Sequence, residues 1–217
     1  MASILITGGT GMIGSALTKE LVSKGHQCII LTRKKYPNPP EPNISYALWN
    51  IEQQTIDEKA IEKADYIVHL AGANVAEGRW TPSRKKEILD SRVQSGALII
   101  KGLKEFPNNV KAVLSASAIG WYGPDFKVPN PKPFEETDSA DNSFLGATCQ
   151  KWEEAIKPVQ ELGKRLVIYR TGIVLSNDGG AYAQFKKPLK FGIASVLGNG
   201  KQMISCCLLY TSDAADE

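Results

Sequence analysis

Three glycines between a strand and a helix constrain this chain more than any other feature. Residues 7–14 read TGGTGMIG, so the glycines follow the spacing G-x-x-G-x-x-G. Ser3–Thr7 is a short apolar, β-branched run that predicts a buried strand, and apolar residues recur at helical spacing from Met12 to Leu21. A strand, a tight turn and a helix N-terminus in this order form the usual cradle for a dinucleotide pyrophosphate. The alternative is a glycine-rich turn that binds no ligand.

Each glycine of the trio has its own task in such a cradle. Gly8 lets the chain turn sharply out of the strand, Gly11 lets the backbone approach the phosphates, and Gly14 lets the helix pack close to the sheet. The free N–H groups and the positive dipole end of the helix then face the anion. We therefore predict that the following residues bind the cofactor: Gly8, Thr10, Gly11, Met12, Ile13 and Gly14.

Strand and helix patterns alternate along the rest of the chain. This alternation predicts an α/β fold with a doubly wound parallel sheet, because right-handed helical crossovers join parallel strands. The strand order expected for a Rossmann-type dinucleotide binder is 3-2-1-4-5-6, with the ligand at the carboxyl ends of strands 1 and 4. The predicted strands are 3–7, 27–32, 44–49, 65–70, 110–115 and 165–171, and the predicted helices are one from Met12 to before Gly25, 56–63, 82–104, 144–162 and a short one at 184–191.

The composition excludes several other classes of protein. A formal net charge of +3 is too small to indicate binding to nucleic acid or to an anionic membrane, and no apolar run is long enough to span a bilayer. The chain leads directly into a strand and lacks a signal-peptide pattern. The four cysteines, at 28, 149, 206 and 207, fit neither a zinc site nor a disulfide framework. We expect a cytoplasmic protein that acts on a small-molecule substrate and holds no metal, and its oligomeric state stays open.

The residues after the second strand bear on the choice between NAD and NADP. An acidic residue there would accept hydrogen bonds from the 2′-hydroxyl of NAD. This chain instead reads Thr32-Arg33-Lys34-Lys35, with no acid before Glu41. Arg33 can form two hydrogen bonds to a 2′-phosphate and Lys34 can add a point charge. We predict NADP(H) rather than NAD(H), bound by Arg33 and Lys34; the alternative is a solvated basic loop.

Four segments together make the sequence similar to the extended short-chain dehydrogenase/reductase family: TGGTGMIG (7–14), DYIVHLAGAN (65–74), SASAIGWYG (115–123) and RTGIVL (170–175). The segments GRW (78–80), Ser91-Arg92, CQKWE (149–153) and GGAYAQFKKPLKFG (179–192) resemble its epimerase-like branch of uncharacterised oxidoreductases. The resemblance implies a nicotinamide cofactor and an NADP(H)-dependent oxidoreductase or epimerase that acts on a small polar substrate.

The segment after the fourth strand adds further candidate cofactor residues. Leu70 precedes Ala71 and Gly72, whose small size permits close contact with a cofactor. Asn74 is a candidate to hydrogen-bond the nicotinamide ribose, with a role in the loop turn as the alternative. His69, inside the strand, is interpreted as a packed core histidine rather than a catalytic one.

The catalytic residues of the resembled family are only partly present. Its Tyr and Lys four residues apart on a helix would exchange the substrate proton, but residues 143–151 of this chain contain no Tyr. Ser117 fits the family's serine, which orients the reacting oxygen. Tyr122 is the candidate acid, with a packed loop aromatic as the alternative. The pair Tyr182 and Lys186 follows the sixth strand and is interpreted as a coincidence.

The missing dyad leaves a second function class open, a non-catalytic NADP(H)-binding sensor or interaction protein. Arg79 and Trp80 are candidates to border a substrate pocket, and Arg92 is expected to bind an anion or to pair with an acid. Cys149 is expected to be buried rather than reactive. Trp152 and Glu153 are interpreted as structural, with Glu153 in a helix-surface ion pair.

The sequence also predicts domain boundaries and a tail of foreign origin. Residues 1–175 are expected to form the nucleotide-binding domain and 176–205 to begin a substrate-binding part whose remainder is largely absent. The last eleven residues read CLLYTSDAADE and resemble, over the whole string, the translation of a common transposase-type sequencing adapter. We therefore expect 206–217 to be a non-native tail, with Trp encoded at position 206. A genuine short polar tail is the alternative.

Overall fold

The fold is described from a computed structural model of the chain. It describes residues 1–34, 41–128, 130–177, 179–193, 200–201 and 203–209. Lys35 and residues 210–217, which belong to two of the predictions above, lie outside the described residues.

Parallel strands form the main sheet, whose order is β4-β3-β2-β1-β5-β6-β7. Its strands are β1 Ser3–Thr7, β2 Gln27–Thr32, β3 Ile44–Asn50, β4 Thr55–Ile56, β5 Tyr66–His69, β6 Ala112–Ala118 and β7 Arg165–Thr171. Without the two-residue edge strand β4, which pairs antiparallel with β3, this order is the predicted 3-2-1-4-5-6. The structure therefore confirms the Rossmann-type doubly wound fold.

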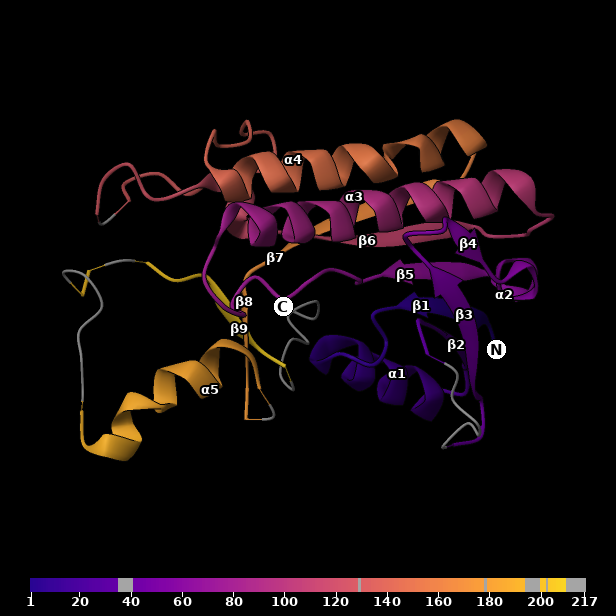
Figure 1. The fold of residues 1–217 in the computed structure, drawn as a ribbon, viewed down its shortest axis with the longest axis horizontal. Helices are drawn as coiled ribbons and strands as arrows, with labels where there is room; N and C mark the ends of the chain where they lie inside the picture. The colour runs from indigo at the N-terminus through magenta and orange to yellow at the C-terminus, as the bar shows by residue number, and fades with distance from the viewer. Residues whose placement is uncertain (35–40, 129, 178, 194–199, 202, 210–217) are drawn as a thin grey trace. The chain divides into compact units, whose positions relative to one another are not determined.

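Helices cover both faces of this sheet (Figure 1). The helices are α1 Met12–Ser23, α2 Glu58–Lys63, α3 Pro82–Glu105, α4 Phe144–Ile156 and α5 Gly180–Lys186, with 3₁₀ helices η1 Ile119–Tyr122, η2 Lys157–Leu162 and η3 Pro188–Phe191. One hydrophobic cluster joins the sheet to α2, α3 and the end of α4. A second joins β1, β2 and β5 to α1 on the opposite face. These two apolar layers hold the helices against opposite faces of the sheet.

Several predicted boundaries differ from the structure for local reasons. The helix predicted over 144–162 ends at Ile156, and η2 continues from there because Pro158 cannot donate the backbone hydrogen bond of an α-helix. The short helix predicted at 184–191 is two elements, α5 and η3, which meet at Pro188. The two-residue strand β4 is too short to produce an alternating pattern.

The described residues form two compact units. Unit 1 contains Met1–Ser117 and Gln150–Tyr169, and unit 2 contains Ala118–Cys149 and Arg170–Glu217. Unit 2 includes a second, two-stranded sheet in which β8 Ile173–Ser176 pairs in parallel with β9 Cys206–Leu208. The first residues of the expected non-native tail are thus part of a strand, while the tail's origin stays a prediction.

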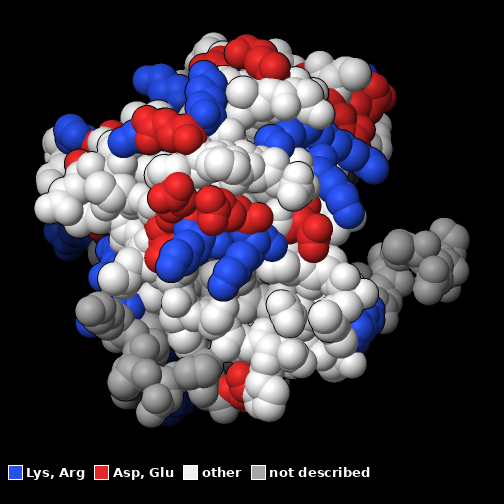
Figure 2. Space-filling model, turned by 90° about the vertical axis from the view of Figure 1, so that its right-hand side faces the viewer, with Lys and Arg blue, Asp and Glu red and all other residues white. Residues whose placement is uncertain are grey.

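The solvent side of α3 carries alternating charges. Arg84 pairs with Glu87, Lys86 with Asp90, and Lys101 with Glu105. Figure 2 shows basic and acidic side chains intermixed on one face of the protein. The pairs of Lys86 and Lys101, whose ammonium groups are exposed, contribute little to stability, so the helix depends on its buried face. Within the described residues no helix is long and apolar enough to cross a bilayer.

A buried hydrogen-bond network ties β1, β5 and α3 together beneath the ligand-binding edge. The Thr7 hydroxyl accepts from the backbone N–H groups of Leu70 and Ala71 at 3.1 and 3.2 Å, so its single proton goes to His69 Nδ1 at 2.7 Å. Nε2 of His69 then carries a proton toward Ser95 Oγ at 3.3 Å, and Ser95 donates to the Ser91 carbonyl at 2.6 Å. The network is satisfied only with a neutral imidazole.

The same network makes stability depend on pH. Complete burial, and secondarily the positive charge of Arg92, lower the pKa of His69 from 6.5 to about 4. Well above pH 6.5 the imidazole is neutral in both the folded and the unfolded chain. As the pH falls toward 4, only the unfolded chain takes up the proton. We therefore expect the free energy of unfolding to fall by about 3 kcal/mol through this window.

Urea unfolding of the wild type and of His69→Gln between pH 7 and pH 4 measures this effect. The His69→Gln variant should lack this decrease in the free energy of unfolding at low pH. The variant His26→Gln, at the other histidine of the chain, should keep the decrease. Equal acid losses in the wild type and His69→Gln would contradict the assignment of a neutral, buried His69.

Candidate functional site

Strand register places the predicted cofactor residues at one edge of the sheet. The last residue of β1, Thr7, lies opposite Leu31 of β2 and His69 of β5, and His69 lies opposite Ser115 of β6. The segments beginning at Gly8, Arg33 and Leu70 therefore leave their strands at the same edge. Parallel strands of a doubly wound sheet bind ligands at this carboxyl edge.

The turn between β1 and α1 has the geometry of a phosphate cradle. Gly8 has a φ of +71°, a conformation that favours glycine, and its carbonyl accepts from the Gly11 N–H at 3.0 Å. A Cβ on Gly14 would lie 2.3 Å from the Gly8 oxygen, so α1 begins directly against the turn. Thr10 and Gly11 remain exposed to a ligand.

The start of α1 fits an anionic group. Gly11 is its N-cap and makes no side-chain capping bond, and the first turn contains no acidic residue. The helix therefore opens without a side-chain acceptor, and its positive dipole end suits a phosphate. When bound, a nicotinamide dinucleotide would supply redox chemistry at its C4 atom, with its pyrophosphate beside Gly11, Met12 and Ile13.

Two exposed basic residues follow β2 at the same edge. Arg33 and Lys34 are both exposed, and the Lys34 N–H donates to Thr32 Oγ1 at 3.2 Å. The backbone is therefore held while both cationic ends face solvent. This is the arrangement that a 2′-phosphate site requires, and equally that of a solvated basic loop.

The backbone after β5 is fixed on both sides. A Cβ on Gly8 would lie 3.0 Å from the Leu70 carbonyl carbon, so β1 and this segment pack tightly. The Asn74 side-chain oxygen accepts from the Ala76 N–H at 3.0 Å, which gives this residue the loop-turn role. Gly72 is exposed. The predicted contacts of Leu70, Ala71, Gly72 and Asn74 with the cofactor stay predictions.

Ser117 lies in a buried polar pair that the sequence did not indicate. Its hydroxyl donates to the Glu153 carboxyl at 2.6 Å, and the two residues are only 2% and 5% exposed. The expected position of Glu153 on the helix surface is therefore wrong. A Ser–Glu contact between a strand end and a helix 36 residues later leaves no local sequence pattern.

Tyr122 belongs to unit 2, where it is packed and hydrogen-bonded. Its ring stacks on Phe134 with centroids 5.1 Å apart, and its hydroxyl oxygen accepts from Arg170 Nη1 at 3.1 Å. Arg170 also lies 3.7 Å from the centroid of the Trp121 ring. Because Arg170 occupies one lone pair, the Tyr122 proton remains available for donation.

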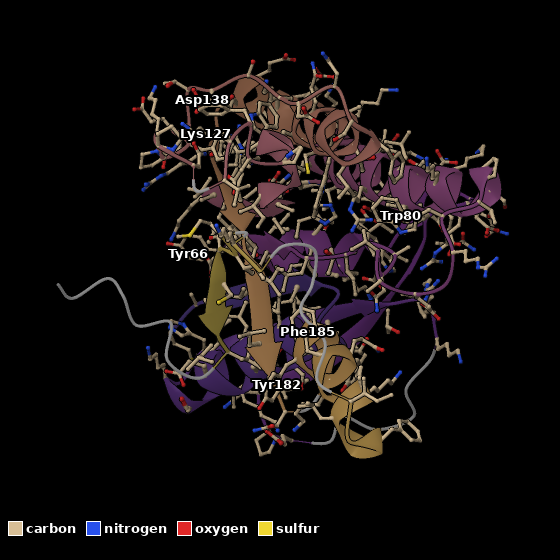
Figure 3. All side chains as sticks on the ribbon, turned by 90° about the vertical axis from the view of Figure 1, so that its left-hand side faces the viewer. Tyr66, Trp80, Lys127, Asp138, Tyr182 and Phe185 are labelled. Atoms are coloured by element: carbon tan, nitrogen blue, oxygen red, sulfur yellow. The ribbon has the colours of Figure 1, made fainter. Side chains whose placement is uncertain are left out.

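An open pocket of about 440 Å³ adjoins Tyr122 within unit 2. It is lined by Tyr122, Phe126, Lys132, Pro133, Phe134, Asp138, Ser139, Ala140, Asp141 and Asn142. Hydrogen bonds from Ser143 lower the pKa of Asp141, which keeps this carboxylate ionised. Aromatic faces beside carboxylates and a lysine suit a small polar ligand. Asp138, one of the residues that line the pocket, is labelled in Figure 3.

The remaining candidates occupy structural positions. Tyr182, labelled in Figure 3, and Lys186 lie on α5, where the ammonium is 4.6 Å from the ring centroid. Cys149 is buried, as expected, with its sulfur 3.6 Å from the Ala118 carbonyl. Trp80 is 42% exposed and donates to the Val75 carbonyl. Among the described residues, no three His, Cys, Asp or Glu side chains form a group that could hold a metal ion.

Comparison with known proteins agrees with this geometry. Residues 4–176 match the model of the NAD dependent epimerase/dehydratase family. The epimerase family protein Mb2239 of Mycobacterium bovis is 33% identical over 204 residues, which cover 94% of this chain and 64% of the relative. The chain thus spans somewhat less than two thirds of this relative's length.

Two solved structures share the fold. The human epimerase family protein SDR39U1, solved with NADPH, has a TM-score of 0.79 and 28% identity, covering 95% of this chain and 66% of that one. The nucleoside-diphosphate sugar epimerase of Corynebacterium glutamicum has a TM-score of 0.77 and 30% identity, covering 96% and 41%. With its glycine cradle, strand order and family match, this chain belongs to the NAD-dependent epimerase/dehydratase family of extended short-chain dehydrogenases/reductases.

Proposed function

We propose that the chain binds NADP(H) at the carboxyl edge of its main sheet and that the whole protein is an NADP(H)-dependent oxidoreductase or epimerase of a small polar substrate. One observation carries the proposal. The cradle of Gly8, Gly11 and Gly14 and the exposed pair Arg33-Lys34 leave adjacent parallel strands at the same edge. The NADPH bound to the human relative supports the cofactor class. The free thiols of Cys28 and Cys149, both outside the expected non-native tail, suit a reducing cytoplasm.

Sugar nucleotides are the substrate class that the comparison favours. The bacterial relative is a nucleoside-diphosphate sugar epimerase, and the pocket beside Tyr122 combines aromatic faces with carboxylates that can accept from hydroxyl groups. Tyr122 donates its proton to the substrate oxygen. The Ser117 proton is held by Glu153, so its oxygen offers lone pairs and orients a substrate hydroxyl.

A second candidate function is an NADP(H)-binding sensor or interaction protein without chemistry. The helix that carries the family's Tyr–Lys dyad has no Tyr between Phe144 and Lys151. Burial of Ser117 beside Glu153 also favours it. NADPH binding without turnover would support the sensor.

Replacement of Arg33 by Ala tests the 2′-phosphate site. We expect NADPH affinity to fall by roughly tenfold or more, because a charge-assisted contact to phosphate is lost, while NADH affinity changes little. Fluorescence titration with both cofactors measures the two affinities. Lys59→Ala, at an exposed lysine of α2, controls for net charge. Equal losses for NADPH and NADH would refute the 2′-phosphate assignment.

Replacement of Tyr122 by Phe tests the proposed acid. We expect turnover of hydroxyl, carbonyl and sugar-nucleotide substrates to fall by about 10²- to 10⁴-fold, the usual contribution of general acid catalysis, with NADPH affinity retained. Absorbance of the reduced cofactor follows net oxidation or reduction, and chromatography of the sugar nucleotide follows epimerisation, which leaves the cofactor unchanged. Tyr182→Phe on α5 is the matched control and should keep full activity. Unchanged turnover in Tyr122→Phe would exclude this residue as the acid.

A further inference from the structure

Helix α3 holds the backbone that follows β5 through two neighbouring side chains. Ser91 Oγ accepts from the Ala73 N–H at 3.0 Å, and Arg92 Nη1 donates to the Ala73 carbonyl at 3.1 Å. Both polar groups of one peptide residue are therefore bound by consecutive residues of one helix. The two bonds fix the position of this segment relative to α3.

Arg92 itself is held from several directions. Its Nη1 also donates to the Ile88 carbonyl at 2.8 Å, one turn earlier on α3. Its guanidinium carbon lies 4.8 Å from the ring centroid of Trp152, which is only 5% exposed. A planar guanidinium stacked on an aromatic ring and bonded to two carbonyls has one stable orientation, so it can act as a rigid support.

Gly72 lies between this guanidinium and the open edge of the sheet. A Cβ added to Gly72 would lie 3.0 Å from Arg92 Cζ and 3.3 Å from both terminal nitrogens. The residue is nevertheless exposed. A Cβ at this position would push the guanidinium by a few tenths of an ångström, so glycine keeps the backbone in close contact with its support.

The two ends of the segment are held by different partners. Leu70 and Ala71 donate their N–H groups to Thr7, directly before the glycine cradle. Ala73 is held by α3 through Ser91 and Arg92. The segment therefore bridges the phosphate cradle and α3, and its placement beyond the cradle depends on Arg92.

We infer that Arg92 is a positioning residue that holds the Gly72–Ala73 backbone against the nicotinamide half of the bound dinucleotide. The inference rests on the proposed NADP(H) site. Arg92 touches the cofactor only through this backbone, so its loss should affect the nicotinamide half and spare the adenosine half. The adenosine half, with its 2′-phosphate, depends on the cradle and on Arg33.

Binding of two ligands to the full chain tests the inference. We expect Arg92→Met, which keeps the length and apolar stem of the side chain, to weaken NADPH binding roughly tenfold, the equivalent of one charge-assisted hydrogen bond. Affinity for 2′,5′-ADP, the adenosine half alone, should change less than about twofold and also reports that the variant is folded. Lys86→Met, at an exposed position of the same helix, should change neither affinity.

A second variant separates the positioning role from general damage. Gly72→Ala pushes against the guanidinium, so we expect it to cause the same selective loss of NADPH affinity. The double variant should lose no more than either single variant, because both changes disrupt one contact. Equal loss of both ligands in Arg92→Met, unchanged NADPH affinity, or multiplied losses in the double variant would overturn the inference. A wild type that binds neither ligand would instead refute the proposed function.

Discussion

The Thr7 hydroxyl is the interaction on which the ligand-binding edge depends. It accepts two backbone N–H groups and donates to His69, so all of its hydrogen-bonding capacity is used inside the core. A buried hydroxyl left without partners would cost free energy, and this cost fixes the distance between the end of β1 and the start of the segment after β5. The glycine cradle begins at the next residue. Its position is therefore set by core chemistry rather than by the loop itself.

Buried polar side chains beneath that edge also contact α3 and α4. His69 passes the network to Ser95, Arg92 stacks on Trp152, and Ser117 donates to Glu153. The first and third contacts tie a strand to a helix, and the second ties α3 to α4. Partly satisfied buried networks are costly, whereas satisfied ones favour a single arrangement. The hydrogen-bonded side chains of this cluster thus favour one arrangement at this end of unit 1, whereas Trp152 Nε1 is buried without a hydrogen-bond partner.

Sequence patterns predicted the parts of the fold that local physics controls. The strands β1, β2 and β7 have the predicted bounds because buried β-branched runs end there at turn residues or at a change of pattern. The helix beginning at Pro82 was also predicted, since proline suits the first helical turn. Pairings between distant elements were not predictable in this way. Glu153 looked like a surface residue because its partner, Ser117, comes from a strand far earlier in the chain.

Arg92 is a second residue whose contacts could not be predicted from the sequence and became clear only in the fold. From the sequence, a lone arginine on a helix suggested an anion or an acidic partner, because charge is the property that a sequence reveals. In the fold the guanidinium donates to backbone carbonyls and lies under a glycine, contacts that the sequence did not indicate. These contacts use its planar shape and several donors, which is why lysine would be a poor substitute. The glycine at position 72 is explained by the same contact, so two residues twenty positions apart form one structural unit.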